Sequence, residues 1–197
     1  GMIAGGVRIA GGCCGTTPEY IRLLVSRARG ISPALIRPRD VTMVSSYTRA
    51  AAFGERPLLI GERINPTGKK LLKQALREGD MDYVLGEGLD QQERGADILD
   101  VNVGLPDIDE PDLLQRAVCE LQAIIDLPLQ IDTADPIAME RALRRYNGKA
   151  LVNSVNGKRE SMAAMFPLVK KYGGVVVALT LDEGGIPDTA EGRVAIA

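Results

Sequence analysis

The chain has 197 residues, 45% of them hydrophobic, with 24 Lys and Arg against 26 Asp and Glu and a net charge of -2. The basic residues are scattered among acidic ones, so we expect no positive surface for nucleic acid or anionic lipid. The longest apolar run, residues 175–181, is far shorter than the ~20 residues that a membrane helix needs. No signal-like segment opens the chain, which predicts a cytoplasmic location and no membrane contact.

Histidine is absent, and cysteine is scarce. The lack of His excludes Ser-His-Asp and Cys-His catalysis, and it excludes zinc bound by imidazole. Three Cys, two of them adjacent, suit neither a disulfide framework nor a paired-Cys redox motif. A reducing compartment fits this cysteine usage best.

Residues 1–30 are predicted to form a strand, a turn and a helix. The strand is expected at residues 7–10, followed by a glycine-rich turn that carries Cys13 and Cys14. Thr17 is the expected N-cap, with Pro18 at the first helical position. Residues 31–56 contain Pro and Ser but no sustained period, which predicts a linker.

After residue 57, strands and helices are predicted to alternate. The expected strands are 58–64, 96–103, 128–133, 150–155 and 175–181, and the expected helices are 69–94, 110–125, 136–146 and 159–172, with another helix opening at 189–197. This alternation indicates a parallel α/β sheet. Spacing alone leaves open whether the sheet is doubly wound or part of a (β/α)8 barrel, which typically needs roughly 250 residues.

Polar residues follow or end each predicted strand. Because parallel folds of both kinds bind ligands at the carboxyl ends of strands, we expect these side chains to converge. Carboxylates and amides can pair with the edge of an amino-pyrimidinone ring. Any single one could instead cap a helix, as we expect of Asp135, or belong to an internal polar network. The set is Glu62, Asn65, Asp100, Asn102, Asp132, Asn153, Asn156, Asp182 and Glu183.

Several strings occur in a specific order: GERIN at 61–65, GADILDVNVG at 95–104, IDT at 131–133, VNS at 152–154 and LTLDEGGIP at 179–187. Together they resemble the methyltetrahydrofolate-binding barrel of cobalamin-dependent methionine synthases and of free-standing methyltetrahydrofolate:corrinoid methyltransferases. Dihydropteroate synthase shares that barrel, but it would carry a GGEST-type stretch at 100–104. The resemblance implies a parallel (β/α)8 TIM-type pterin-binding barrel over 57–197, truncated after about five strands and preceded by one βα unit and a linker.

The string GGCCGT at 11–16 resembles the zinc-binding end of the homocysteine-binding barrel, which precedes the folate barrel in methionine synthases. The resemblance implies zinc ligands at Cys13 and Cys14, in a site that lacks its third Cys. Cys119, in the middle of a predicted helix, is expected in the core. The alternative is that Cys13 and Cys14 are small buried residues.

The resemblance also implies a reaction and its residues. The methyl group of 5-methyltetrahydrofolate would pass to cob(I)alamin, held by another domain or a corrinoid protein, and then to homocysteine. Asp132 and Asn153 are implied as the catalytic, pterin-holding pair, and the further pterin contacts would be Asp100, Asn102, Glu62, Asn65 and Asp182. Because other family contacts would fall after residue 197, the chain alone is expected to be impaired or inactive.

Other functions stay open at this point. The chain could be a free-standing corrinoid methyltransferase, a non-catalytic pterin-binding or scaffold piece, or an open-sheet enzyme unrelated to folate. An incomplete barrel would also expose two sheet edges, which predicts self-association.

Overall fold

The computed structural model describes residues 1–35, 40–54 and 56–197. Two compact units are present, Gly1–Asp40 and Val41–Ala197. The boundary between them therefore falls inside the predicted linker, of which residues 36–39 and 55 lie outside the described residues. No helix in the described ranges is both long enough and apolar enough to cross a bilayer.

The described residues of the first unit contain one helix, α1 (Pro18–Ala28), as the sequence predicts. The side chain of Thr17 accepts a hydrogen bond from the Tyr20 N–H at 3.4 Å and caps the helix. The predicted strand at 7–10 is wrong, because residues 1–35 contain no strand. A strand needs a neighbour for its backbone groups, and no other segment of residues 1–35 provides one. No residue of α1 is buried, so its apolar stripe packs against no core within the described residues.

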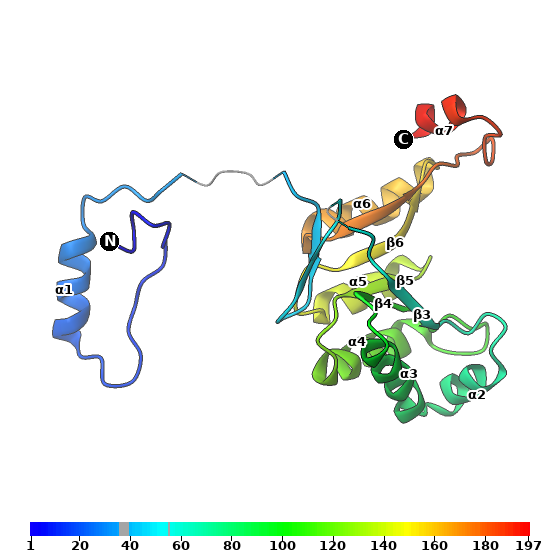
Figure 1. Cartoon of the computed structure of the whole chain (residues 1–197), viewed down its shortest axis with the longest axis horizontal. Coiled ribbons are helices and arrows are strands. Elements are labelled where there is room, and N and C mark those ends of the chain that lie inside the picture. Colours follow the sequence, from blue (N-terminus) through cyan, green and yellow to red (C-terminus); the bar gives the residue numbers. More distant parts are fainter. Residues whose placement is uncertain (36–39, 55) are drawn as a thin grey trace. The chain divides into compact units, whose positions relative to one another are not determined.

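The second unit is built on a five-stranded parallel sheet whose strand order follows the chain order (Figure 1). A doubly wound sheet would reverse its strand order, so the sequential order matches the wall of a barrel and confirms that fold class. In the described residues the strands are β3 (Ile60–Ile64), β4 (Ile98–Val101), β5 (Leu129–Asp132), β6 (Leu151–Asn156) and β7 (Val175–Leu179). The helices are α2 (Lys70–Glu78), α3 (Met81–Glu93), α4 (Glu110–Ile124), α5 (Pro136–Arg145), α6 (Arg159–Tyr172) and α7 (Ala190–Ile196).

The predicted helix at 69–94 is two helices. Gly79 ends α2 in the left-handed region with a φ of 69°, a conformation that favours glycine. Asp80 then starts α3, where its side chain accepts the Tyr83 N–H at 3.2 Å. The Gly-Asp pair is therefore a stop and a start signal that the amphipathic pattern conceals.

The main core lies between the sheet and its helices. Leu99, Ile131 and Val152 of neighbouring strands are fully buried, and so are Leu114 and Leu121 of α4. Leu99, Ile131 and Val152 face these helices, so the side chains that alternate with them lie on the opposite face, which is apolar near the start of the strands, at Ile98 and Leu151, and polar toward their carboxyl ends. This division positions the candidate site.

Part of the predicted linker is a β-hairpin of the second unit. Strands β1 (Met43–Ser45) and β2 (Ala50–Ala52) pair antiparallel, and Val44 is fully buried in one cluster with Ile98 and Leu151. Ser45 also bridges to Lys149, just before β6. The hairpin therefore lies at the amino-terminal ends of the parallel strands. The linker prediction failed here because two three-residue strands carry too few residues to show a period.

Tyr146 connects this hairpin to the sheet. Its hydroxyl accepts the Leu129 N–H at 2.9 Å and donates to the Ser45 carbonyl at 2.8 Å, and burial raises its pKa to about 12. Tyr146→Phe should leave the Leu129 N–H without a partner, whereas the Ser45 carbonyl still accepts the Lys149 N–H at 2.9 Å, and it should lower the free energy of unfolding by about 1–3 kcal/mol. Urea denaturation measures this. Tyr47→Phe, which removes an exposed hydroxyl, is the matched control and should change stability by less than ~0.5 kcal/mol. An equal effect of both substitutions would contradict this role.

Candidate functional site

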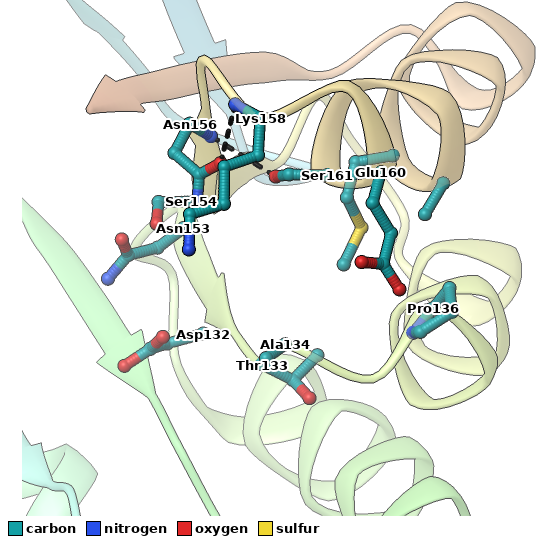
Figure 2. Close-up of a pocket in the computed structure, with 12 residues that line it drawn as sticks. Asp132, Thr133, Ala134, Pro136, Asn153, Ser154, Asn156, Lys158, Glu160 and Ser161 are labelled. Carbon is teal, nitrogen blue, oxygen red and sulfur yellow. Dashed lines mark hydrogen bonds between the residues drawn. The ribbon is translucent and has the colours of Figure 1, made fainter. Parts of the chain in front are cut away.

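Asp132 and Asn153 are neighbours at the carboxyl ends of β5 and β6. They are paired in the parallel register, and the Thr133 N–H donates to the Asn153 carbonyl at 3.2 Å. Figure 2 shows that the carboxylate of Asp132 and the amide of Asn153 extend to the same side of the two strands. The structure therefore brings together the two residues that the resemblance implied as the central pair.

Asn102 follows β4 and holds Asp132 in place. Its Nδ2 donates to Asp132 Oδ2 at 2.9 Å, and its Oδ1 accepts the Gly104 N–H at 2.9 Å. Both ends of the amide are therefore occupied, which fixes its orientation. Asn102 therefore orients the carboxylate of Asp132, and its predicted contact with the pterin stays a prediction.

Asp100 lies deeper on the same face, two residues before Asn102, and its side chain is fully buried. Gln130, its register partner on β5, donates a hydrogen bond to one carboxylate oxygen. The other oxygen, Oδ2, has no hydrogen-bond partner among the described residues. Burial, reinforced by the negative charges of Asp132 and Glu62, raises the pKa of Asp100 to about 7. The Gln130 hydrogen bond and the nearby Asn153 amide oppose this shift only in part.

The same cause acts on Asp132. Burial raises the pKa of its carboxyl, the Asn102 hydrogen bond lowers it, and the charge of Glu62 adds to the rise. Glu62, an exposed residue of β3, is thus close enough to act on both carboxyls. Glu62 therefore acts on Asp100 and Asp132 through its negative charge, and it makes no hydrogen bond to either carboxyl among the described residues. Its predicted contact with the pterin stays a prediction.

Asn65 and Asp182 make local turns. Asn65 Oδ1 accepts the Thr67 N–H at 3.0 Å, and Asp182 Oδ1 accepts the Gly184 N–H at 2.8 Å. Among hydrogen bonds of the described residues, none joins either side chain to Asp132. Their predicted pterin contact stays a prediction.

The strand-end side chains of Asn102, Asp132 and Asn153 are called the rim below. Three further residues support this rim, and the sequence analysis did not single them out. Lys69 Nζ donates to the carbonyls of Glu62 and Arg63 at 2.9 and 2.8 Å, and burial lowers its pKa. The Thr133 hydroxyl donates to Glu110, the first residue of α4. The position of Thr133 directly after Asp132, within the IDT string, was the one available signal.

A pocket of about 400 Å³ adjoins the rim between the β5–α5 and β6–α6 connections. Its lining includes Asp132 and Asn153, together with Lys158, Ser161 and Met165. Figure 2 shows these connections surrounding the open space. A ligand that contacts the two rim residues therefore has adjoining space for a substituent.

Within the described residues, the two adjacent cysteines do not complete a zinc site. Cys13 and Cys14 are exposed, with their sulfur atoms 3.8 Å apart. A structural zinc takes four ligands, and the described ranges hold no group of three or more His, Cys, Asp or Glu placed to bind a metal. The residues present therefore do not fit zinc, and their exposure also contradicts the alternative that they are buried. Cys119 is half-buried in α4.

Residues 61–195 match the sequence profile of the family described as "Pterin binding enzyme". The chain belongs to this family of pterin-binding enzymes. It is 31% identical to methionine synthase of Mycobacterium leprae over 204 residues and 32% identical to that of Mycobacterium tuberculosis over 199 residues. Each match covers 98% of this chain, which spans 17% of the length of either relative.

Solved dihydropteroate synthases share the fold. The Xanthomonas albilineans enzyme in complex with indole-2-carboxylic acid and 6-chloroguanine superposes with a TM-score of 0.53 and 23% identity, covering 74% of this chain and 52% of that one. The same enzyme with 4-aminobenzoic acid gives a TM-score of 0.54 and 22% identity, covering 75% and 54%. Both matches support the barrel-type sheet.

The pKa of Asp100 predicts a pH dependence of stability. The folded chain keeps the Asp100 proton up to about pH 7, whereas the unfolded chain loses it near pH 4. The contribution of this group to stability is therefore greatest below about pH 4 and is lost as pH rises to about 7, by up to about 4 kcal/mol. Asp100→Asn should remove this fall and stabilise the protein at pH 8. Urea denaturation from pH 4 to 8 measures it.

Asp97→Asn is the matched control for that experiment. The Arg56 hydrogen bond lowers the pKa of Asp97 to about 2, so its contribution is present above about pH 4 and lost as pH falls toward 2. The control variant should keep the decline between pH 4 and 7. An unchanged decline in Asp100→Asn would refute the assignment to Asp100.

Proposed function

We propose that this chain binds the pterin ring of 5-methyltetrahydrofolate at the rim formed by Asp132, Asn153 and Asn102. In this proposal the chain supplies part of the folate barrel for methyl transfer to a corrinoid and on to homocysteine in methionine synthesis. Membership of the pterin-binding family and the similarity to two methionine synthases support it. The observation that carries it is the pairing of Asp132 with Asn153 on one side of the sheet, oriented by the Asn102 hydrogen bond.

The chemistry of the rim suits a pterin edge. One carboxylate oxygen of Asp132 is occupied by Asn102, which leaves the other to accept a ring N–H or an amino hydrogen. The Asn153 amide beside it offers one donor and one acceptor. Asp100, which holds a proton up to about pH 7, adds a carboxyl next to this edge that is neutral below that pH.

Methyl transfer from a tertiary amine requires more than binding. The N5 atom leaves poorly unless it gains a proton or a strong hydrogen bond near the transition state, so the residues at the rim must orient the ring and hold a proton in reach. A reduced corrinoid, carried by another domain or protein, would supply the nucleophile when bound. We assign no homocysteine step to Cys13 and Cys14, because they do not fit zinc.

A binding test separates this proposal from a structural role. Asp132→Asn keeps the size of the side chain and an oxygen that can accept from Asn102, but it removes the charge that strengthens a hydrogen bond to the ring. Calorimetric titration with 5-methyltetrahydrofolate should show affinity for the wild-type chain that falls about 10- to 100-fold in the variant.

Asp135→Asn provides the matched control, since Asp135 is the half-buried N-cap of α5 and Asn caps equally well. Its affinity should equal that of the wild type. Absence of binding heat from the wild-type chain, or equal affinity of Asp132→Asn, would reject the pterin role.

The sheet edges favour a second possibility, a binding or scaffold piece that associates with itself. β3 and β7 are the outer strands of the sheet, and Leu179 on β7 is 40% exposed.

Because unpaired strand edges invite pairing with other chains, we expect self-association, which Leu179→Lys should weaken. Light scattering across a dilution series measures this. Leu71→Lys on α2 is the control and should associate like the wild type; a wild-type monomer at all concentrations would contradict the expectation.

A further inference from the structure

We propose that the pocket beside the rim binds the anionic glutamyl tail of the folate substrate and that Lys158 recognises its carboxylate. This inference rests on the proposed pterin role of the same rim. It assigns a second part of the substrate to residues that the pterin ring itself does not need.

The position of the pocket is the first step. Its lining includes both Asp132 and Asn153, whose carboxylate and amide point away from its open space, so a ligand held by these two groups would reach the pocket past the ends of β5 and β6 (Figure 2). The volume of about 400 Å³ gives room for a substituent that leaves the ring at this edge. A substrate with a ring at one end and a charged tail at the other could therefore occupy the rim and the pocket together.

The charge of Lys158 is the second step. Its backbone N–H donates to Asn156 Oδ1 at 3.0 Å, which fixes the start of the side chain. Figure 2 shows the side chain running back along the open space toward Asn153. Among the described residues its ammonium group makes no ion pair within 4 Å, in contrast to Lys171, which pairs with Glu140 at 2.7 Å. Lys158 thus carries a positive charge at the pocket with no carboxylate in contact.

The remaining walls are the third step. Met165, Ala164 and Ala134 give one part of the lining an apolar character that suits the aromatic ring preceding the tail. Ser161 Oγ accepts the Asn156 N–H at 3.2 Å, so its own hydrogen stays available to donate to a carboxylate.

Two acidic residues limit where an anion can bind. Figure 2 shows Glu160 pointing toward Pro136, on the opposite side of the pocket from Lys158. Glu183 accepts the Arg159 N–H at 2.9 Å, which lowers its pKa, and the charges of Arg159 and Lys158 lower it further. A tail carboxylate is therefore expected at the Lys158 end, away from Glu160, although the nearby Glu183 offsets part of the Lys158 charge there.

The test compares ligands with and without a tail. The probes are 5-methyltetrahydrofolate with three glutamates and 5,6-dimethyltetrahydropterin, which has none, titrated calorimetrically into the full chain. Lys158→Gln should weaken binding of the triglutamate about three- to tenfold and leave the affinity for the tail-less pterin unchanged. Glu160→Gln should have the opposite effect and raise the affinity for the triglutamate, because it removes a negative charge from the pocket. Lys170→Gln, an exposed lysine in the last turn of α6, is the matched control and should change neither.

The outcomes are distinguishable. Circular dichroism melts establish that each variant folds like the wild type. If both probes bind and Lys158→Gln weakens them equally or not at all, the tail site is overturned and the pterin role stands. If neither probe binds the wild-type chain, the pterin role is overturned and the tail site with it.

Discussion

The site depends on the parallel register of β4, β5 and β6. Asp100 is paired with Gln130, and Asp132 with Asn153, so alternate residues of successive strands fall on one face at successive depths. The residues between them, such as Val101 and Ile131, are buried against the helices. A slip of one residue would turn every polar side chain into the core. The apolar core therefore fixes the geometry of the polar face.

Gathering carboxylates on a shielded face has an energetic cost. Asp100 is fully buried, one of its oxygens lacks a partner among the described residues, and Asp132 and Glu62 are close enough to raise its pKa. A sequence selected for stability alone would place an apolar residue there. A buried charge of this kind is typical of binding and catalytic sites, and here it lies next to the candidate rim within the part of the chain that matches the pterin-binding family.

The sequence predicted the parallel repeat well because each of its signals is local. Hydrophobic runs mark the strands, and Asp135 with Pro136 marks the start of α5. The sequence analysis missed the hairpin at 43–52, because its strands are held by partners distant in sequence, such as Lys149. It also predicted a strand at 7–10 that does not form, because no segment of residues 1–35 pairs with it. For the same reason Asp132 and Asn153 were found as strand-end residues, while Gln130, Lys69 and Glu110 were not. Their roles come from register and loop contacts, which a single sequence does not encode visibly.

The two ends of the parallel strands serve different purposes. At the amino-terminal end, the hairpin is joined to the sheet by complete hydrogen bonds: Ser46 Oγ donates to the Asp126 carbonyl at 2.6 Å, and the Tyr146 hydroxyl uses both its donor and an acceptor site. At the carboxyl end, Asp100 keeps an unpaired oxygen and Lys158 an unpaired charge within the described residues. Barrel folds generally place stability at the first end and function at the second. Polar groups have hydrogen-bond partners at the end that holds the fold together, and one oxygen of Asp100 and the ammonium group of Lys158 lack one among the described residues at the end where we propose that a ligand binds, so the unpaired groups coincide with the candidate binding face.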